Sequence, residues 1–183
     1  MIELRVYRAA EFPQVLEWQV RDFVRIVWSE SHVDDPAIPL GDPSRDPINF
    51  VVVDGELLIS HAQVTTFTIE HAGKVYRVAG IGGVMTYPNF RKGGYGAQVI
   101  SAATNHIAKS GVDFGMLFTS PDREAFYNRN GWIAVSNVEI LVGEKSNPHP
   151  RDEFTMMYPV SPRGQQAVQA FENARLYVGP HGW

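Results

Sequence analysis

Three glycines beside two basic residues give this sequence its clearest capacity for chemistry. Arg91 and Lys92 come directly before Gly93 and Gly94, and Gly96 follows after one intervening residue. Because glycine lacks a side chain, main-chain N–H groups in such a turn can approach an oxyanion closely. The two bases add positive charge beside those groups. The spacing therefore predicts a site that binds a diphosphate.

The segments on either side of this turn favour the same interpretation. Residues 75–86 predict a strand that Pro88 ends, because proline cannot donate a ladder hydrogen bond. Residues 94–110 predict a helix, whose N-terminus would direct roughly half a positive charge at a bound anion. The dinucleotide fingerprint fails at Val99, and the P-loop motif occurs nowhere in the chain. Without its flanking elements, the turn would be explained equally well as a glycine-rich loop with two solvated bases.

The remaining hydrophobic pattern predicts an α+β fold, in which helices flank one central mixed sheet. Ser120 is expected to cap a helix that starts at Pro121. No long linker or repeat divides the chain, so residues 1–183 are expected to form a single domain. Further strands are expected at residues 2–7, 50–53, 57–70, 114–118, 133–142 and 154–160, and helices at 12–28 and 121–130, with weak helical character at 163–175.

Composition limits the classes of function. The chain has no cysteine, so disulfides, thiolate nucleophiles and cysteine metal sites are excluded, and its six histidines show no metal-ligand spacing. We therefore expect no metal. The formal charge of -4 argues against a nucleic-acid partner. No apolar run is long enough for a membrane span, and the first residues are unlike a signal peptide. These features predict a cytoplasmic protein.

A long irregular segment at residues 29–48 is unusually acidic. It contains four prolines and, against the single base Arg45, five acids: Glu30, Asp34, Asp35, Asp42 and Asp46. Such a loop near a cleft would attract a cationic substrate. A solvated, proline-rich loop explains the composition equally well.

Two motifs together resemble the GNAT family of N-acetyltransferases. Arg91-x-x-Gly94-x-Gly96 is similar to the family's R/Q-x-x-G-x-G/A signature, and Phe126-Tyr127 followed by Gly131-Trp132 is similar to its second signature. The resemblance implies that the protein binds acetyl-CoA at a splayed sheet centre and acetylates an amine, and that it has the homodimeric state common in the family. The cofactor-binding residues that it implies are Val84, Met85, Thr86, Arg91, Lys92, Gly93, Gly94, Tyr95, Gly96, Ala97 and Ser120.

The resemblance also implies catalytic roles. A main-chain N–H, expected at Met85, would bind the thioester oxygen, and Tyr127 would protonate the departing thiolate. The base stays open, since Gly82 stands where the family's aminoglycoside 2'-N-acetyltransferase branch has a glutamate. The candidates are the carboxylate of Trp183, His181, Glu30, Asp34 and Asp35, and an acceptor amine of low pKa would need none.

That branch is the nearest resemblance within the family. Ser120 stands where the branch departs from the more common Asn, and Trp183 follows a glycine-containing tail, as in the branch. The expected acceptor is therefore a primary amine on a small cationic molecule that resembles an aminoglycoside. The alternatives are a degenerate module that binds acyl-CoA without turnover, which Gly82 favours, and an enzyme that acetylates protein N-termini or lysines.

Overall fold

The computed structural model describes residues 1–28 and 45–180 and divides the chain into two compact units. The first unit contains residues 1–65 and 83–103, and the second contains residues 66–82 and the chain from 104 onward. Strands β3 (Leu57–His71) and β4 (Lys74–Thr86) run from one unit into the other. The fold is α+β, with a central, mostly antiparallel sheet and flanking helices, as the sequence predicts.

The first unit has the strand order β1-β2-β3-β4. β1 (Ile2–Arg8) pairs antiparallel with β2 (Ile48–Asp54), and β2 pairs antiparallel with β3. Gly55 begins the two-residue turn between β2 and β3 with φ +62°. The Asp54-Gly55 pair in the sequence predicts a tight primed hairpin turn, and a positive φ at the first turn position, typical of a type II′ turn, confirms it.

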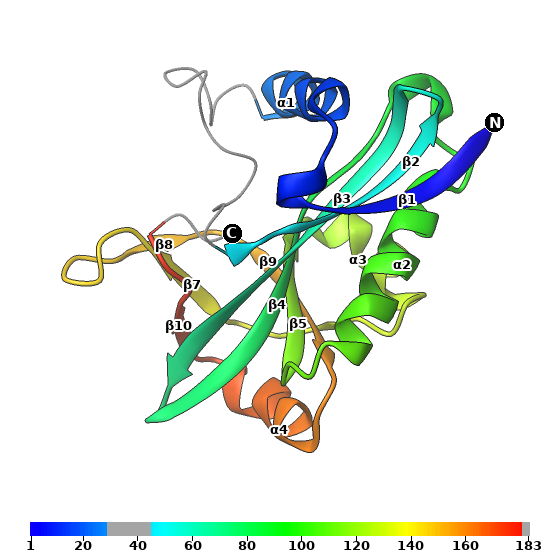
Figure 1. The fold of residues 1–183 in the computed structure, drawn as a ribbon. Coiled ribbons are helices and arrows are strands. Elements are labelled where there is room, and N and C mark those ends of the chain that lie inside the picture. Colours follow the sequence, from blue (N-terminus) through cyan, green and yellow to red (C-terminus); the bar gives the residue numbers. More distant parts are fainter. Residues whose placement is uncertain (29–44, 181–183) are drawn as a thin grey trace. The chain divides into compact units, whose positions relative to one another are not determined.

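Helix α1 (Gln14–Val27) supplies much of the first unit's core and appears in blue in Figure 1. Its apolar side chains at helical spacing pack against β2, β3 and β4. Val27, which the sequence assigns to the same stripe, is 46% exposed, and Trp18 is 58% exposed. The core cluster comprises Leu16, Val20, Phe23, Val51, Val53, Leu58 and Met85.

Helix α2 (Tyr95–Lys109) follows β4 through a short 3-10 turn, η4 (Pro88–Phe90). The sequence predicts one apolar stripe on this helix from Gly96, Val99, Ile100, Ala103 and Ile107. The last four are fully buried, and Gly96 is half-buried. Gly111, just beyond the helix, has φ +70°, a left-handed conformation that suits a glycine C-cap.

The second unit contains two groups of paired strands. β4 pairs parallel with β5 (Phe114–Thr119), which pairs antiparallel with β9 (Phe154–Pro159), and β9 also pairs with β6 (Ile133–Ala134). A smaller sheet has the order β10-β7-β8. Its strands are β7 (Glu139–Val142), β8 (His149–Arg151) and β10 (Arg175–Tyr177).

Helix α4 (Pro162–Phe171) closes the core of the second unit. Ser161 caps it by accepting a hydrogen bond from the main-chain N–H of Gly164 at 3.0 Å. Gly164 has no room for a side chain, because an added Cβ would lie 1.8 Å from the carbonyl oxygen of Asp113. Around this contact, Phe114, Met116, Met157 and Phe171 are fully buried.

Several expected elements differ from the structure. The helix expected at 121–130 is a 3-10 turn, η5 (Pro121–Arg123), followed by the short helix α3 (Glu124–Asn128). The strand expected at 133–142 divides into β6 and β7, since Asn137 takes φ +54°, which an extended strand cannot contain. Strands β8 and β10 are not expected from the sequence. Three-residue strands form through tertiary pairing, which short-range periodicity does not reveal.

Candidate functional site

The turn between β4 and α2 places left-handed residues directly before the start of a helix. Lys92 and Gly94 both have positive φ, at +68° and +81°. The main-chain N–H of Gln98 donates to the Gly94 oxygen at 3.1 Å. The N–H groups of residues 95–97 precede that bond, so they lack the intrahelical acceptors of later residues. No acid occupies the first turn of α2 to compete for these donors.

The glycines of this turn serve different physical needs. Gly94 supplies the left-handed backbone, and a Cβ there would meet nothing within 4 Å. Gly93 supplies space, because a Cβ there would lie 2.7 Å from the ring of Tyr95 and 3.1 Å from the Phe90 oxygen. The rings of Phe90 and Tyr95 make an edge contact at 6.1 Å. The aromatic pair therefore sets the path of the chain into α2.

Arg91 connects the turn to the end of β4. Its Nε donates to the main-chain oxygen of Thr86 at 3.2 Å, and its side chain is exposed. This hydrogen bond holds the guanidinium at the end of β4. The cationic and glycine residues predicted to bind a diphosphate are thus brought together within one unit.

The last residues of β4 are held by side chains from β3. Ser60 Oγ donates to the main-chain oxygen of Met85 at 2.7 Å and lies 2.9 Å from Thr86 Oγ1. Met85 is 6% exposed, and its side chain belongs to the core. The parallel ladder between β4 and β5 covers Val78–Ile81, and it ends before this segment.

A buried histidine fixes the one irregular point in β4. Gly83 has φ +59°, and its oxygen lies 2.8 Å from Nδ1 of His61. The other ring nitrogen, Nε2, lies 3.0 Å from Asn49 Oδ1, and that oxygen accepts a hydrogen bond from Gln63 Nε2 at 3.1 Å. A Cβ at Gly83 would lie 3.2 Å from the imidazole, so glycine allows both the turn and the close approach.

Burial decides the protonation state of this imidazole. The residue is 1% exposed, and loss of water lowers the pKa of His61 from 6.5 to about 4, although the Gly83 hydrogen bond opposes the change. At neutral pH the ring is therefore uncharged. Because a main-chain carbonyl can only accept, its single N–H belongs on Nδ1 and donates to Gly83. The unprotonated Nε2 then makes no hydrogen bond to Asn49 Oδ1, which is also an acceptor. Sequence analysis missed the structural role of His61, because no local sequence motif indicates it.

Tyr127 lies on α3 in the second unit and is 6% exposed. Burial raises the pKa of its phenol, while a hydrogen bond with Thr119 and the charge of Arg123 lower it to a smaller degree. The phenol therefore keeps its proton at neutral pH, as a proton donor must. The neighbouring Phe126 ring packs edge-on at 5.0 Å.

The end of the second signature has a structural role. Trp132 is 2% exposed, and its indole N–H donates to Thr104 Oγ1 at 3.0 Å. Its ring lies against Gly115, where an added Cβ would come within 2.8 Å. Gly131 takes φ +82° to turn the chain between α3 and β6. These contacts anchor α3, and hence Tyr127, to the sheet of the second unit.

The structure corrects the expected role of Ser120 as a helix cap. Ser120 Oγ makes no capping bond to a main-chain N–H and instead donates to Asp122 Oδ1. This hydrogen bond is the largest of the effects that lower the pKa of the Asp122 carboxyl, and the hydrogen bond with Arg123 lowers it further. The hydroxyl therefore bonds a side chain two residues later, and no main-chain N–H of the following turn reaches it. Its cofactor role stays a prediction.

Several candidates for a base lie outside the described residues, namely Glu30, Asp34, Asp35, His181 and Trp183. Of the expected site residues that are described, those from 84 to 97 lie in the first unit, and Ser120 and Tyr127 lie in the second. Across residues 1–28 and 45–180, no group of three or more histidine or acidic side chains could hold a metal ion.

Comparison with known proteins gives one family match and several structural matches. Residues 5–135 match the family model described as an acetyltransferase (GNAT) domain. No curated protein sequence matches the chain.

Among solved structures, the chain is similar to an acyl-CoA N-acyltransferase from Pseudomonas aeruginosa, with a TM-score of 0.62, 16% identity, and coverage of 86% of this chain and 99% of that one. ElaA from Escherichia coli gives a TM-score of 0.61 at 18% identity, with coverage of 86% and 99%. An aminoglycoside 6'-N-acetyltransferase complexed with coenzyme A gives 0.59 at 15% identity, with coverage of 87% and 98%. At these identities, the likeness concerns the fold.

Proposed function

This chain belongs to the GNAT family of acetyltransferases, and from that premise we propose that it acetylates the primary amine of a small, cationic acceptor. Membership makes the protein an acyltransferase that uses acetyl-CoA as its acyl donor. The observation that carries the proposal is the turn at residues 91–97. It combines exposed bases, two left-handed residues and the open N-terminus of a helix.

The turn fits the diphosphate of coenzyme A. Main-chain donors at the start of α2 would bind the phosphate oxygens, and Arg91, held by Thr86, would supply a charge that is already positioned. Lys92 would add charge without fixed geometry. The pantetheine arm would then extend along residues 84–86 of β4, beyond the point where the ladder with β5 ends.

Main-chain geometry at the end of β4 supports a donor for the thioester oxygen. Ser60 fixes the Met85 carbonyl and His61 fixes the Gly83 carbonyl, so the peptide groups between them are held from both sides. A donor held in place before the reaction can lower the barrier by about 3 kcal/mol as charge develops on the oxygen. We assign this role to the main-chain N–H of Met85.

Tyr127 is the proposed acid. Acetyl transfer releases a thiolate, and a buried phenol whose pKa is raised remains protonated and can donate to it. Thr119 orients the hydroxyl through the hydrogen bond that opposes this rise. Ser120, one residue further along, would then lie beside the cofactor rather than act on the proton.

The cationic nature of the acceptor rests on the acidic segment at residues 29–48, which lies largely outside the described residues. Five acids beside a cleft would concentrate polyamines or aminoglycosides by attraction. An aminoglycoside acceptor would agree with the branch that Ser120 and the C-terminal tryptophan resemble. Gly82 provides no carboxylate, so a base would come from that segment, from residues 181–183, or from an acceptor amine that is already neutral.

Calorimetric titration with coenzyme A tests the cofactor site. Arg91→Ala is expected to weaken binding about tenfold, the effect of losing a charged hydrogen-bond partner worth about 1.4 kcal/mol. Lys109→Ala is the matched control, since it removes one exposed positive charge from the other end of α2. Equal effects of the two substitutions would refute the assignment of Arg91.

A thiol-release assay with acetyl-CoA tests the acceptor. Polyamines, aminoglycosides, neutral amines and lysine peptides are compared at equal concentration, and the proposal expects turnover with the polycations at low ionic strength and its loss as salt rises. Tight binding of coenzyme A without thiol release for any amine would instead identify a binding module. Turnover of lysine peptides alone would identify a protein acetyltransferase.

A further inference from the structure

One face of the edge strand β1 is apolar and exposed. Among the described residues, β1 has a strand neighbour only on its β2 side. Ile2, Leu4 and Val6 alternate along the strand and so share a face, and they are 41%, 42% and 51% exposed. Their neighbours on that face of β2, Val52 and Phe50, are 0% and 2% exposed. The strand thus continues a buried apolar face into solvent.

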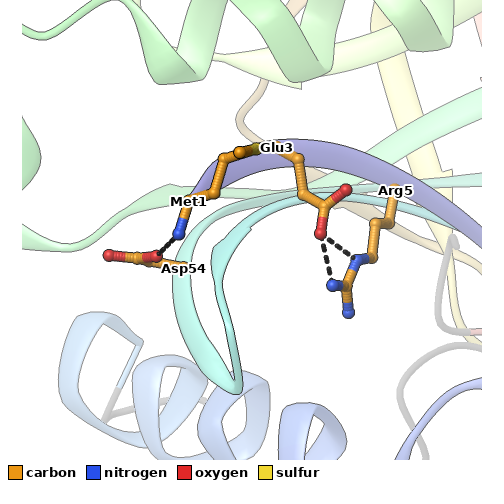
Figure 2. Close-up of polar contacts among 4 residues, drawn as sticks. All are labelled: Met1, Glu3, Arg5 and Asp54. Atoms are coloured by element: carbon orange, nitrogen blue, oxygen red, sulfur yellow. Dashed lines mark hydrogen bonds and ion pairs between the residues drawn. The ribbon is translucent and has the colours of Figure 1, made fainter.

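The opposite face of β1 carries a pair of opposite charges. Figure 2 shows the Glu3 and Arg5 side chains pointing toward one another, with Arg5 Nε 3.0 Å from Glu3 Oε1. Hydrogen bonds raise the pKa of the Arg5 guanidinium; the bond to Glu3 has the larger effect and the bond to Tyr7 the smaller one. Nearby, the Met1 amine makes an ion pair with Asp54 at 2.5 Å. An edge strand with unpaired main-chain groups and an apolar face can accept another strand.

The residue order of β1 indicates which partner strand would fit beside it and in which register. In a two-fold antiparallel pair, residues directly opposite each other share a face, so apolar residues meet apolar ones only when the axis passes through a residue. An axis at Glu3 would oppose two glutamates, and an axis at Arg5 would oppose two arginines. An axis at Leu4 places Glu3 opposite the second copy's Arg5 and Ile2 opposite its Val6.

We propose that β1 pairs antiparallel with β1 of a second copy of this chain, about a two-fold axis at Leu4. The pairing joins two sheets into one and places the apolar side chains of the two β1 strands side by side on one face, where they contact one another. It also converts two local ion pairs into an alternating set of four charges. A partner with a different sequence would lack this self-complementarity, and closed two-fold pairing is the commonest symmetry of protein oligomers.

The expected dimer is weak because the contact is small. β1 has seven residues, and a single strand pair buries less than the roughly 1,200 Å² of a standard interface. Association is therefore expected to depend on concentration, with a dissociation constant of about micromolar or weaker. The proposal concerns assembly and is independent of the acetyltransferase function.

Sedimentation equilibrium over a wide concentration range tests the assembly. The wild-type chain, of 20.5 kDa, is expected to shift reversibly toward twice that mass. Leu4→Lys opposes two lysines at the axis and should weaken association about tenfold or more, which is about 1.4 kcal/mol. Val75→Lys is the matched control, since Val75 is a 54% exposed aliphatic residue on β4. A wild type that stays monomeric, or equal effects of the two lysines, would overturn the proposal.

Charge exchange tests the register itself. Glu3→Arg gives a strand with two positive residues and Arg5→Glu gives one with two negative residues, so each variant alone should dimerise less than wild type. Mixed together, they restore both opposite pairs and should form a heterodimer, as should the double exchange with itself. Both positions are exposed, and circular dichroism checks that the variants fold. Failure of the mixture to associate better than either variant alone would refute the axis at Leu4.

Discussion

Removing the imidazole of His61 should change how the protein's stability depends on pH. In the folded state the pKa of this residue is about 4, against 6.5 for an unburied histidine. Between these values the unfolded chain binds a proton that the folded chain excludes. Stability from this residue is therefore complete above about pH 6.5 and falls as the pH decreases toward about 4.

The size of the effect follows from the same difference. Each pKa unit is worth about 1.4 kcal/mol, so the difference between 6.5 and about 4 corresponds to about 3 kcal/mol of unfolding free energy. The group is 1% exposed, so solvent screens it little. A loss of this size is a large part of the marginal stability typical of a folded domain.

Urea unfolding of the wild type and of His61→Asn, followed by circular dichroism from pH 7.5 to 4, measures the effect. Asparagine places an amide N–H near the position of Nδ1 and can still donate to the Gly83 oxygen, yet it carries no titrating group. The variant should be the less stable at pH 7.5, and the gap should close by about 3 kcal/mol toward pH 4.

Carboxylates contribute equally to the pH-dependent stability of the wild type and of His61→Asn, so their contribution cancels when the two are compared. His149→Asn is the matched control, because it removes an exposed imidazole from β8 by the same substitution. If the stability gap between wild type and His61→Asn were the same at pH 7.5 and pH 4, the inference that burial keeps this ring neutral would be wrong.

Three further substitutions test the site and the fold. Tyr127→Phe should lower kcat about a hundredfold and leave coenzyme A binding by calorimetry unchanged, because it removes only the proton donor; an unchanged kcat would exclude the phenol from the reaction. Gly94→Ala should cost about 1 kcal/mol in urea unfolding and weaken coenzyme A binding, since its φ of +81° disfavours a side chain. Gly164→Ala should cost about 3 kcal/mol, because its Cβ would overlap the Asp113 oxygen, and thermal melting would detect the loss.

The elements that the sequence predicts well are those whose information is local. The apolar stripe of α2 is buried from Val99 to Ile107 as expected, and Gly55 and Gly111 take the positive φ that their turns require. The cationic turn is also local, since Arg91 and Gly94 occur within four residues and owe their geometry to adjacent elements. Short-range patterns suffice where the interacting groups are neighbours in the chain.

The elements that the sequence predicts poorly depend on distant partners. Strand β10 is three residues long and exists through its parallel pairing with β7. Its signal, buried Leu176 and Val178 in alternation, is too short to separate from coil. Ser120 has the residue type of a helix cap, yet its hydroxyl donates a hydrogen bond to the nearby Asp122 carboxylate. Competition among partners of this kind is settled by geometry rather than by residue type.

The sequence by itself indicated the family, which the match over residues 5–135 confirms. It also led to the proposed diphosphate site, because glycines, bases and a helix start would act on a ligand through main-chain groups close together in the chain. Only the tertiary structure decided the role of His61. Its neighbours, Asn49 and Gly83, come from two other strands, and its low pKa arises from burial by the whole unit. Desolvation is a property of the folded surroundings, so the low pKa of His61 could not be predicted from the spacing of residues along the chain.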